Sequence, residues 1–247
     1  DDKEAPKFLN AFDGEKISYS KSDADNPKIA ANGVAFNWNG VRISSKLPGE
    51  FNLYNILAAI SFAKAINIPT ETIKRGVEKV QSIRGRAEKI ELPGESEMRR
   101  AQEFSVIVDY AHTPDSLEKL YQTYAGKFRI CVLGNTGGGR DKWKRPIMGR
   151  IADTYCDKII LTNEDPYDED PEQIIREVAS GIKNKQPSVI LNRRSAIHEA
   201  LVRATKEDVV LITGKGTDPF IMGPHGTKEP WDDATVVREE LKNLART

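Results

Sequence analysis

Short apolar runs alternate with amphipathic helical patterns throughout the second half of this 247-residue sequence. Each run suits one buried strand, and each pattern between runs has the spacing of a helix with one apolar face. Such alternation is typical of βαβ units, which set strands in parallel and helices on the sheet faces. The sequence therefore predicts a Rossmann-like α/β domain with a mostly parallel sheet. We expect strands at residues 105–109, 129–133, 158–161, 189–191 and 209–213, and helices at 114–124, 144–155, 171–183, 194–204 and 233–244.

The first part of the chain has a different pattern, in which short strand-like pieces precede two helices. Asn39-Gly40 separates two alternating runs and predicts a hairpin. A polar, turn-rich segment at 91–103 predicts a domain boundary, which gives one domain over 1–91 and another over 92–247. The expected strands are 16–20, 33–38 and 41–44, and the expected helices are 52–66 and 70–80, the second with Thr70 as its N-cap.

Composition excludes several classes of protein. The 37 Lys and Arg balance 37 Asp and Glu, so the formal net charge is zero and nothing indicates a nucleic-acid or membrane partner. No apolar stretch approaches the roughly 20 residues that span a bilayer. The only cysteines, Cys131 and Cys156, lack metal-type spacing, which predicts reduced thiols, a cytoplasmic protein and no metal ligands in this chain.

A glycine-rich turn at 134–140 follows the predicted strand 129–133. Glycines allow backbone N–H groups to approach an anion, although a plain turn explains the glycines equally well. Cations follow directly, and their mutual repulsion favours an anionic ligand over a solvated helix start. They are Arg140, Lys142, Lys144 and Arg145.

Other chemically capable residues follow the remaining strands. Asp109 is a candidate for binding ribose hydroxyls or for capping the next helix, and His112 for a general base or a structural role. The acidic loop 162–170 indicates either an amine-bearing substrate or an N-cap cluster ending at Asp170. A Gly-Lys-Gly segment begins at Gly214. Because the carboxyl ends of parallel strands share one edge, we expect one crevice to collect these loops.

Several of these segments together form a recognisable series. Leu-Pro-Gly-Glu-Phe-Asn starts at residue 47, Gly-Arg-Ala-Glu at 85 and Val-Asp-Tyr-Ala-His-Thr-Pro-Asp at 108. Further along come Gly-Gly-Gly-Arg-Asp at 137, Thr-Asn-Glu-Asp-Pro at 162 and Gly-Lys-Gly at 214. The whole chain resembles the Mur ligase family, and within it most closely the UDP-N-acetylmuramyl-tripeptide synthetases.

The resemblance implies a function and a domain identity. It implies ATP- and Mg²⁺-dependent amide formation: the carboxyl group of a UDP-MurNAc-dipeptide becomes an acyl phosphate, which an amino acid's amine attacks. The pathway is peptidoglycan precursor synthesis, and with it cell-wall biogenesis, cell shape and cell division. Residues 1–91 would be the latter part of the central ATPase domain, and 92–247 the C-terminal ligase domain.

The resemblance also assigns roles to individual residues. Asn52 and Asn55 would lie near the adenine, while Arg86 and Asp109 would hold the ribose and phosphates. The nucleotide site would also include His112 and Lys142. The incoming amino acid would be held by Arg140, Glu164, Asp165, Pro166, Tyr167, Gly214 and Asp218.

The sequence departs from the family in two ways. Family members that add diaminopimelate read Asp-Asn-Pro-Arg where this chain reads Glu164-Asp-Pro-Tyr167, and Gly-Lys-Gly-His-Glu where it reads Gly-Lys-Gly-Thr-Asp218. Without that arginine, lysine, another diamine or a neutral amino acid fits better than diaminopimelate. The uridine-nucleotide domain, the P-loop and the carbamylated lysine are missing, so we expect a portion of a longer ligase, inactive alone. The alternatives are a folylpolyglutamate synthetase-like ligase and a non-catalytic nucleotide-binding module.

Overall fold

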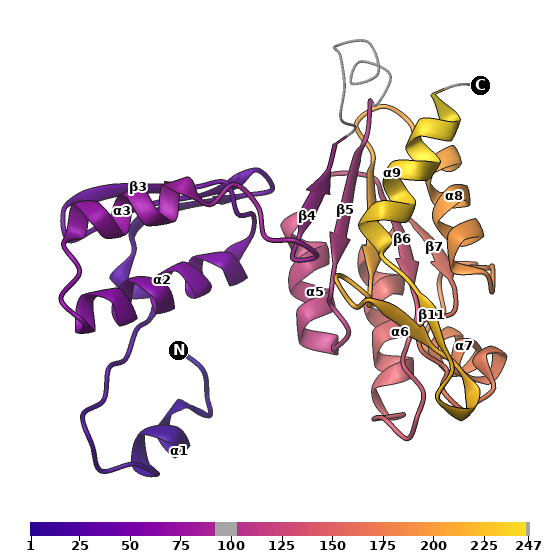
Figure 1. The fold of residues 1–247 in the computed structure, drawn as a ribbon, viewed down its shortest axis with the longest axis horizontal. Coiled ribbons are helices and arrows are strands. Elements are labelled where there is room, and N and C mark those ends of the chain that lie inside the picture. The colour runs from indigo at the N-terminus through magenta and orange to yellow at the C-terminus, as the bar shows by residue number, and fades with distance from the viewer. Residues whose placement is uncertain (92–102, 246–247) are drawn as a thin grey trace. The chain divides into compact units, whose positions relative to one another are not determined.

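The computed structural model describes residues 1–91 and 103–245, and its chain divides into two compact units, Asp1–Ser82 and Ile83–Thr247 (Figure 1). The division falls before the boundary expected after residue 91. The reason is strand β4 (Glu88–Ile90), which pairs antiparallel with β5 (Ser105–Asp109) and so belongs to the second unit's sheet. Apart from Glu91 and Glu103, the expected linker 91–103 lies outside the described residues.

The first unit packs two helices against a three-stranded antiparallel sheet in the order β1-β2-β3. Alternate residues of β2 are buried, as the period of a strand with one apolar face requires. Asn39 and Gly40 both have positive φ, 47° and 76°, so the predicted hairpin turn is confirmed. The elements are α1 (Ala5–Asn10), a 3₁₀ turn (Lys21–Asp23), β1 (Asp25–Ala30), β2 (Gly33–Trp38), β3 (Val41–Ser45), α2 (Glu50–Ala65) and α3 (Thr70–Lys79).

Two predictions about this unit were wrong. Residues 16–20 form no strand, and the first strand is β1 instead. Every residue of β1 is exposed and the strand contains Pro27, so an edge strand of this kind carries no hydrophobic alternation to detect. Thr70 is the first helical residue of α3 and not its cap, because Pro69 holds the N-cap position with extended backbone.

The second unit contains a six-stranded sheet in the order β4-β5-β9-β6-β7-β8. Every strand pair of this sheet except β4–β5 is parallel, which confirms the predicted Rossmann-like domain with a mostly parallel sheet. Helices α8 and α9 share one apolar cluster with alternate strand residues such as Val108, Val132 and Ile212. The further bounds are α5 (Pro114–Thr123), β6 (Arg129–Leu133), α6 (Lys144–Tyr155), β7 (Lys158–Leu161), α7 (Pro171–Ala179), β8 (Ser188–Val189), α8 (Arg193–Arg203), β9 (Val209–Thr213) and α9 (Asp233–Leu244).

The sequence patterns also missed a small hairpin. Strand β10 (Phe220–Met222) pairs with β11 (Lys228–Pro230) around a 3₁₀ turn at Pro224–Gly226. Strands of three residues are too short to show a period, which is why β4 and this hairpin had no detectable signal.

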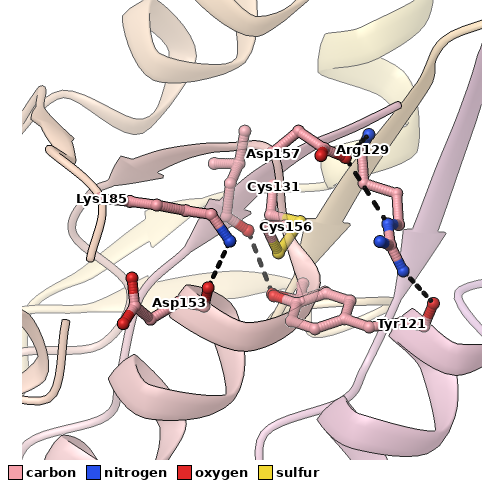
Figure 2. Close-up of a disulfide and its surroundings, with 9 residues drawn as sticks. Tyr121, Arg129, Cys131, Asp153, Cys156, Asp157 and Lys185 are labelled. Carbon is pink, nitrogen blue, oxygen red and sulfur yellow. Dashed lines mark hydrogen bonds and ion pairs between the residues drawn. A yellow bond between two sulfur atoms is a disulfide. The ribbon is translucent and has the colours of Figure 1, made fainter. Parts of the chain in front are cut away.

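A disulfide joins Cys131 on β6 to Cys156 at the end of α6, with their Cα atoms 6.1 Å apart (Figure 2). The expectation of two reduced thiols is therefore wrong. Helix α6 follows β6 and runs back along the sheet. Its C-terminal end therefore lies next to β6, the strand that precedes it. Next to the disulfide, Arg129 donates its backbone N–H to Asp157 Oδ2 over 2.8 Å. The loop closed by the bond contains the glycine-rich turn and the whole of α6.

Candidate functional site

A polar pocket of about 90 Å³ lies where the loops after β5, β6, β7 and β9 meet. These loops follow the carboxyl ends of neighbouring parallel strands, which is the position at which open α/β sheets bind ligands. The lining contains both carboxylates and cations, so the pocket suits a ligand that carries both charges. Its lining residues are Tyr110, His112, Thr136, Arg140, Lys144, Glu164, Asp165, Tyr167, Gly214 and Asp218.

Glu164 is the most unusual group in this lining, because it is a carboxylate exposed by only 2%. Its Oε1 accepts a 2.8 Å hydrogen bond from Thr136 Oγ1, whereas Oε2 has no partner among the described residues. Burial raises the pKa of Glu164, and the Arg193 guanidinium opposes that rise. A buried acceptor without a partner is costly to a fold, so a ligand donor is the natural complement.

The four cations after the glycine-rich turn have different surroundings. Lys142 pairs with Glu169 at 3.0 Å, and the buried Arg145 pairs with Glu169 at 3.1 Å and Glu177 at 2.6 Å. Lys144 donates to the carbonyl of His112 over 3.0 Å. Carboxylates of the chain itself therefore supply the anions for two of these cations. Arg140 is exposed and its guanidinium has no partner within residues 1–91 and 103–245, which leaves it available to a ligand.

The glycines of this turn allow it to pack closely against the turn at residues 164–167. A Cβ at Gly137 would lie 2.2 Å from the carbonyl oxygen of Pro166, which no side chain allows. The Gly137 N–H donates to the Asp165 carbonyl at 2.7 Å, and the Gly139 N–H to Glu169 Oε1 at 3.1 Å. Because both amides are bonded within the protein, the phosphate-cradle interpretation is wrong for them.

Most acids of the 162–170 loop are also bonded within the chain. Asp165 accepts from Lys215 Nζ, and Asp168 accepts from the His225 N–H at 2.7 Å. Asp170 caps α7 through the Glu172 N–H, which confirms the N-cap interpretation for that residue. Hydrogen bonds from Arg145, Lys142 and Gly139 lower the pKa of Glu169 to about 2. Glu164 is thus the buried acid of this loop that has an oxygen without a partner among the described residues.

Asp109 fixes the backbone beside the pocket. Its two carboxylate oxygens accept the N–H groups of Ala87 and Ala111, each at 2.6 Å, and burial raises its pKa. The cap of α5 comes from Thr113, so the capping interpretation of Asp109 is wrong. The loop after Asp109 carries Tyr110, whose ring centroid lies 4.6 Å from the Arg86 guanidinium.

The structure brings together only part of the predicted site. Lys142, Arg86, Asp109 and Pro166 lie outside the pocket lining, and Asn52 and Asn55 belong to α2 of the first unit. Sequence reasoning missed Tyr110 and Thr136 and treated Lys144 only as part of a cation cluster. Tyr110 lies within the motif that starts at residue 108, and Thr136 lies within the glycine-rich turn at 134–140, but no single-residue signal marks either of them. The predicted residues in the lining are His112, Arg140, Glu164, Asp165, Tyr167, Gly214 and Asp218.

The described residues contain neither a cluster typical of a metal centre nor a helix typical of a membrane span. Within residues 1–91 and 103–245, no three or more His, Cys, Asp or Glu side chains gather as they would around a metal ion. In the same residues, no helix is long and apolar enough to cross a membrane.

Comparison with known proteins gives consistent matches. Residues 96–216 match the family described as Mur ligase, glutamate ligase domain. UDP-N-acetylmuramoyl-L-alanyl-D-glutamate–2,6-diaminopimelate ligase 1 of Clostridium acetobutylicum is 34% identical over 99% of this chain and 52% of its own length. The corresponding ligase of Aquifex aeolicus is 36% identical over 98% of this chain and 50% of its own length. The chain spans about half the length of the curated relatives it matches.

A solved structure shows the same similarity in three dimensions. A UDP-N-acetylmuramoyl-L-alanyl-D-glutamate–2,6-diaminopimelate ligase superposes with a TM-score of 0.62 at 28% identity. The superposition covers 94% of this chain and 47% of that one.

Proposed function

Because the chain belongs to the Mur ligase family, we propose that it forms the amino-acid-binding part of an ATP-dependent ligase that extends a UDP-MurNAc-peptide. The observation that carries this proposal is one pocket that contains two groups of opposite charge without a partner among the described residues, the Arg140 guanidinium and Glu164 Oε2. An amino acid presents a carboxylate to the first and an ammonium group to the second. Charge-assisted hydrogen bonds of this kind are strong and directional.

The reaction joins an amine to an activated carboxyl group. A phosphoryl group passes from ATP to the peptide carboxylate, giving an acyl phosphate and ADP. The bound ammonium group first loses a proton and becomes an amine. The amine nitrogen then forms a bond to the acyl carbon, the bond from that carbon to the phosphate oxygen breaks, inorganic phosphate leaves, and the nitrogen loses a second proton. In this scheme Arg140 orients the amino acid by its carboxylate, and Glu164 with Asp218 holds its amine. Positioning is the main contribution that such a site makes.

Other parts of the proposal rest on the family resemblance. Asn52, Asn55, Arg86, Asp109, His112 and Lys142 are assigned to ATP. Mg²⁺ would act with ATP, and the described residues gather no cluster of three or more His, Cys, Asp or Glu side chains to hold it. The proposed setting is cytoplasmic peptidoglycan precursor synthesis, and through it cell shape and cell division. We expect the 247-residue chain to bind an amino acid without completing the reaction.

Tyr167 guides the choice of amino acid. It takes a left-handed backbone conformation, with φ of 50°, and lines the pocket where diaminopimelate-adding relatives are expected to place arginine. A phenol ring offers no cation to a second carboxylate. We therefore propose lysine, another diamine or a neutral amino acid as the substrate, and not diaminopimelate.

Calorimetric titration of the chain tests the proposal with L-lysine, L-alanine, meso-diaminopimelate and L-glutamate as ligands. We expect lysine or alanine to bind, and Arg140→Gln and Glu164→Gln each to weaken binding about 10- to 100-fold, the range for a lost charged hydrogen bond. Arg150→Gln, which changes an exposed arginine outside the pocket lining, is the control. A preference for glutamate would favour a folylpolyglutamate synthetase-like enzyme. No binding of any amino acid would favour a non-catalytic module.

A further inference from the structure

Arg193 is a fully buried arginine behind the pocket that no motif or comparison assigns a role. It is the first residue of α8, and its side chain is exposed by only 1%. A cation at a helix N-terminus opposes the helix dipole, and burial adds a desolvation cost. Such a position needs compensation from specific partners.

The guanidinium finds its partners on three other segments of the chain. Its Nε and Nη2 donate to the two carboxylate oxygens of Asp233 over 2.8 and 2.7 Å, which is a bidentate pair with an equally buried acid. Nη2 also donates to the Thr213 carbonyl at 2.9 Å, and Nη1 to the Asn163 carbonyl at 3.4 Å. Trp231 Nε1 donates to the same Asp233 at 2.8 Å and holds it in place.

The two carbonyls lie at informative places in the sequence. Asn163 immediately precedes Glu164, and Thr213 immediately precedes Gly214. A Cβ at Gly214 would lie 2.1 Å from Glu164 Oε2, so these two segments touch inside the pocket. One side chain therefore holds both strand ends at the point where they build the amino-acid site.

We propose that Arg193 is a positioning residue for the amino-acid pocket, holding the backbone before Glu164 and before Gly214 while its charge acts on the Glu164 carboxylate. This inference rests on the proposed function, since it concerns the same pocket. The charged groups that act on Glu164 are Arg193, Lys215 and Asp165, and Thr136 adds a hydrogen bond. Tyr110 also faces it, since the charge of Glu164 contributes to the raised pKa of that phenol.

The alternative is that the Arg193–Asp233 pair only holds α8 against α9. A buried ion pair removed as a whole often costs a fold little, whereas removal of one partner leaves an uncompensated charge. The test therefore uses Arg193→Gln/Asp233→Asn, with Arg193→Gln and Arg193→Lys beside it. The matched control is Arg194→Gln, which changes the neighbouring arginine, an exposed residue paired with Glu239 and Glu240.

L-lysine is titrated into each variant by calorimetry from about pH 5 to about pH 8. We expect the double variant to bind at least about tenfold more weakly at the acid end of this range, with a smaller loss at the alkaline end, because Glu164 without the nearby cation ionises at higher pH. Arg193→Lys keeps the charge and should recover part of the affinity, and Arg194→Gln should match the wild type. A folded double variant with wild-type affinity and pH dependence would overturn the inference.

A second readout does not require any amino acid to bind. The ¹³C chemical shift of the Glu164 carboxyl group, followed against pH by NMR, should show a higher midpoint in the double variant than in the wild type. An unchanged midpoint would overturn the inference. If the midpoint rises while no amino acid binds to the wild type, the proposed function fails and the electrostatic role of Arg193 stands.

Discussion

The ammonium group of Lys215 lies 2.8 Å from both carboxylate oxygens of Asp165, and its side chain is exposed by only 1%. The pair connects the loop after β9 to the loop after β7, so it fixes the two walls of the pocket against each other. Asp165 also accepts the Met222 N–H at 2.8 Å, which attaches the β10 strand to the same point. An acid that the sequence offered as a ligand group is thus largely engaged in holding the site together.

We expect Lys215→Met to destabilise the second unit by about 3–5 kcal/mol, because it leaves the Asp165 charge buried without its partner. Urea unfolding followed by circular dichroism measures the change. Lys142→Met is the control: its ammonium is 58% exposed and pairs with Glu169, so its loss should cost about 0–1 kcal/mol. Equal costs for the two variants would contradict the assigned role of the Lys215–Asp165 pair.

Glu164→Gln should make the protein more stable at neutral pH. Burial raises the pKa of Glu164 above its ordinary value of 4.5, so the folded state holds the proton more tightly than the unfolded state. The contribution of Glu164 is therefore greatest below about pH 4.5 and is lost as pH rises through the folded-state pKa. We expect the variant to be more stable than the wild type at pH 7, with the difference closing below about pH 4.5, in thermal unfolding curves recorded against pH. A variant less stable than the wild type at pH 7 would refute this.

Glu169→Gln should change stability in the opposite direction. Hydrogen bonds from Arg145 lead the causes that lower the Glu169 pKa to about 2, so its stabilising contribution is present above pH 4.5 and is lost as pH falls toward 2. The variant should be less stable than the wild type at pH 7, with the difference closing in acid. The same unfolding curves measure both variants, and equal signs for the two would contradict the electrostatic account of this loop.

Gly214→Ala should damage both stability and the pocket. The position has φ of 107°, and a Cβ there would lie 2.1 Å from Glu164 Oε2. Gly126→Ala is a matched control, because φ is 82° but nothing lies within 4 Å of the added carbon. Backbone strain alone should cost about 1 kcal/mol at Gly126. Gly214→Ala should lower the free energy of unfolding by about 1–3 kcal/mol more than Gly126→Ala, as measured by thermal unfolding. It should also weaken amino-acid binding. Equal losses of stability in the two variants would show that the contact with Glu164 is unimportant.

Reduction of the Cys131–Cys156 disulfide should lower the stability of the second unit without abolishing its fold. Both sulfur atoms are buried, so reduction requires unfolding and refolding with dithiothreitol. A crosslink between residues 25 positions apart contributes about 2–4 kcal/mol to the free energy of unfolding. Cytoplasmic thiols are usually reduced, so a protein placed there must fold without the crosslink. The measurements are thermal unfolding with and without reductant and thiol titration in denaturant.

The control is the double variant Cys131→Ala/Cys156→Ala, whose stability should not change when reductant is added. Detection of two reactive thiols in the wild type before reduction would contradict the disulfide.

Local sequence patterns predicted most elements of the second unit, though not β4 or the β10–β11 hairpin, and the edge of the sheet where the pocket lies. Apolar runs such as 105–109 and 209–213 are buried on both faces, so their composition alone marks them as strands of a parallel sheet. Motif order then indicated the family, and the matches bear that out. The turn signal at Asn39-Gly40 and the cap signal at Asp170 succeeded because those conformations depend on neighbouring residues, whereas the cap predicted at Thr70 was wrong.

Only the tertiary structure decided which charged groups stay available. Asp165 and Lys215 are 50 residues apart, and Arg193 and Asp233 are 40 apart, so no local pattern reveals that they neutralise each other. The disulfide and the pairing of β4 with β5 depend in the same way on contacts made after the chain folds back. The sequence by itself could thus list the acids and cations at one sheet edge. Packing and burial decided which of them pair inside the protein and left Arg140 and Glu164 Oε2 without partners in the part of the chain that the structure describes, because the energy of a charge depends on its neighbours in space.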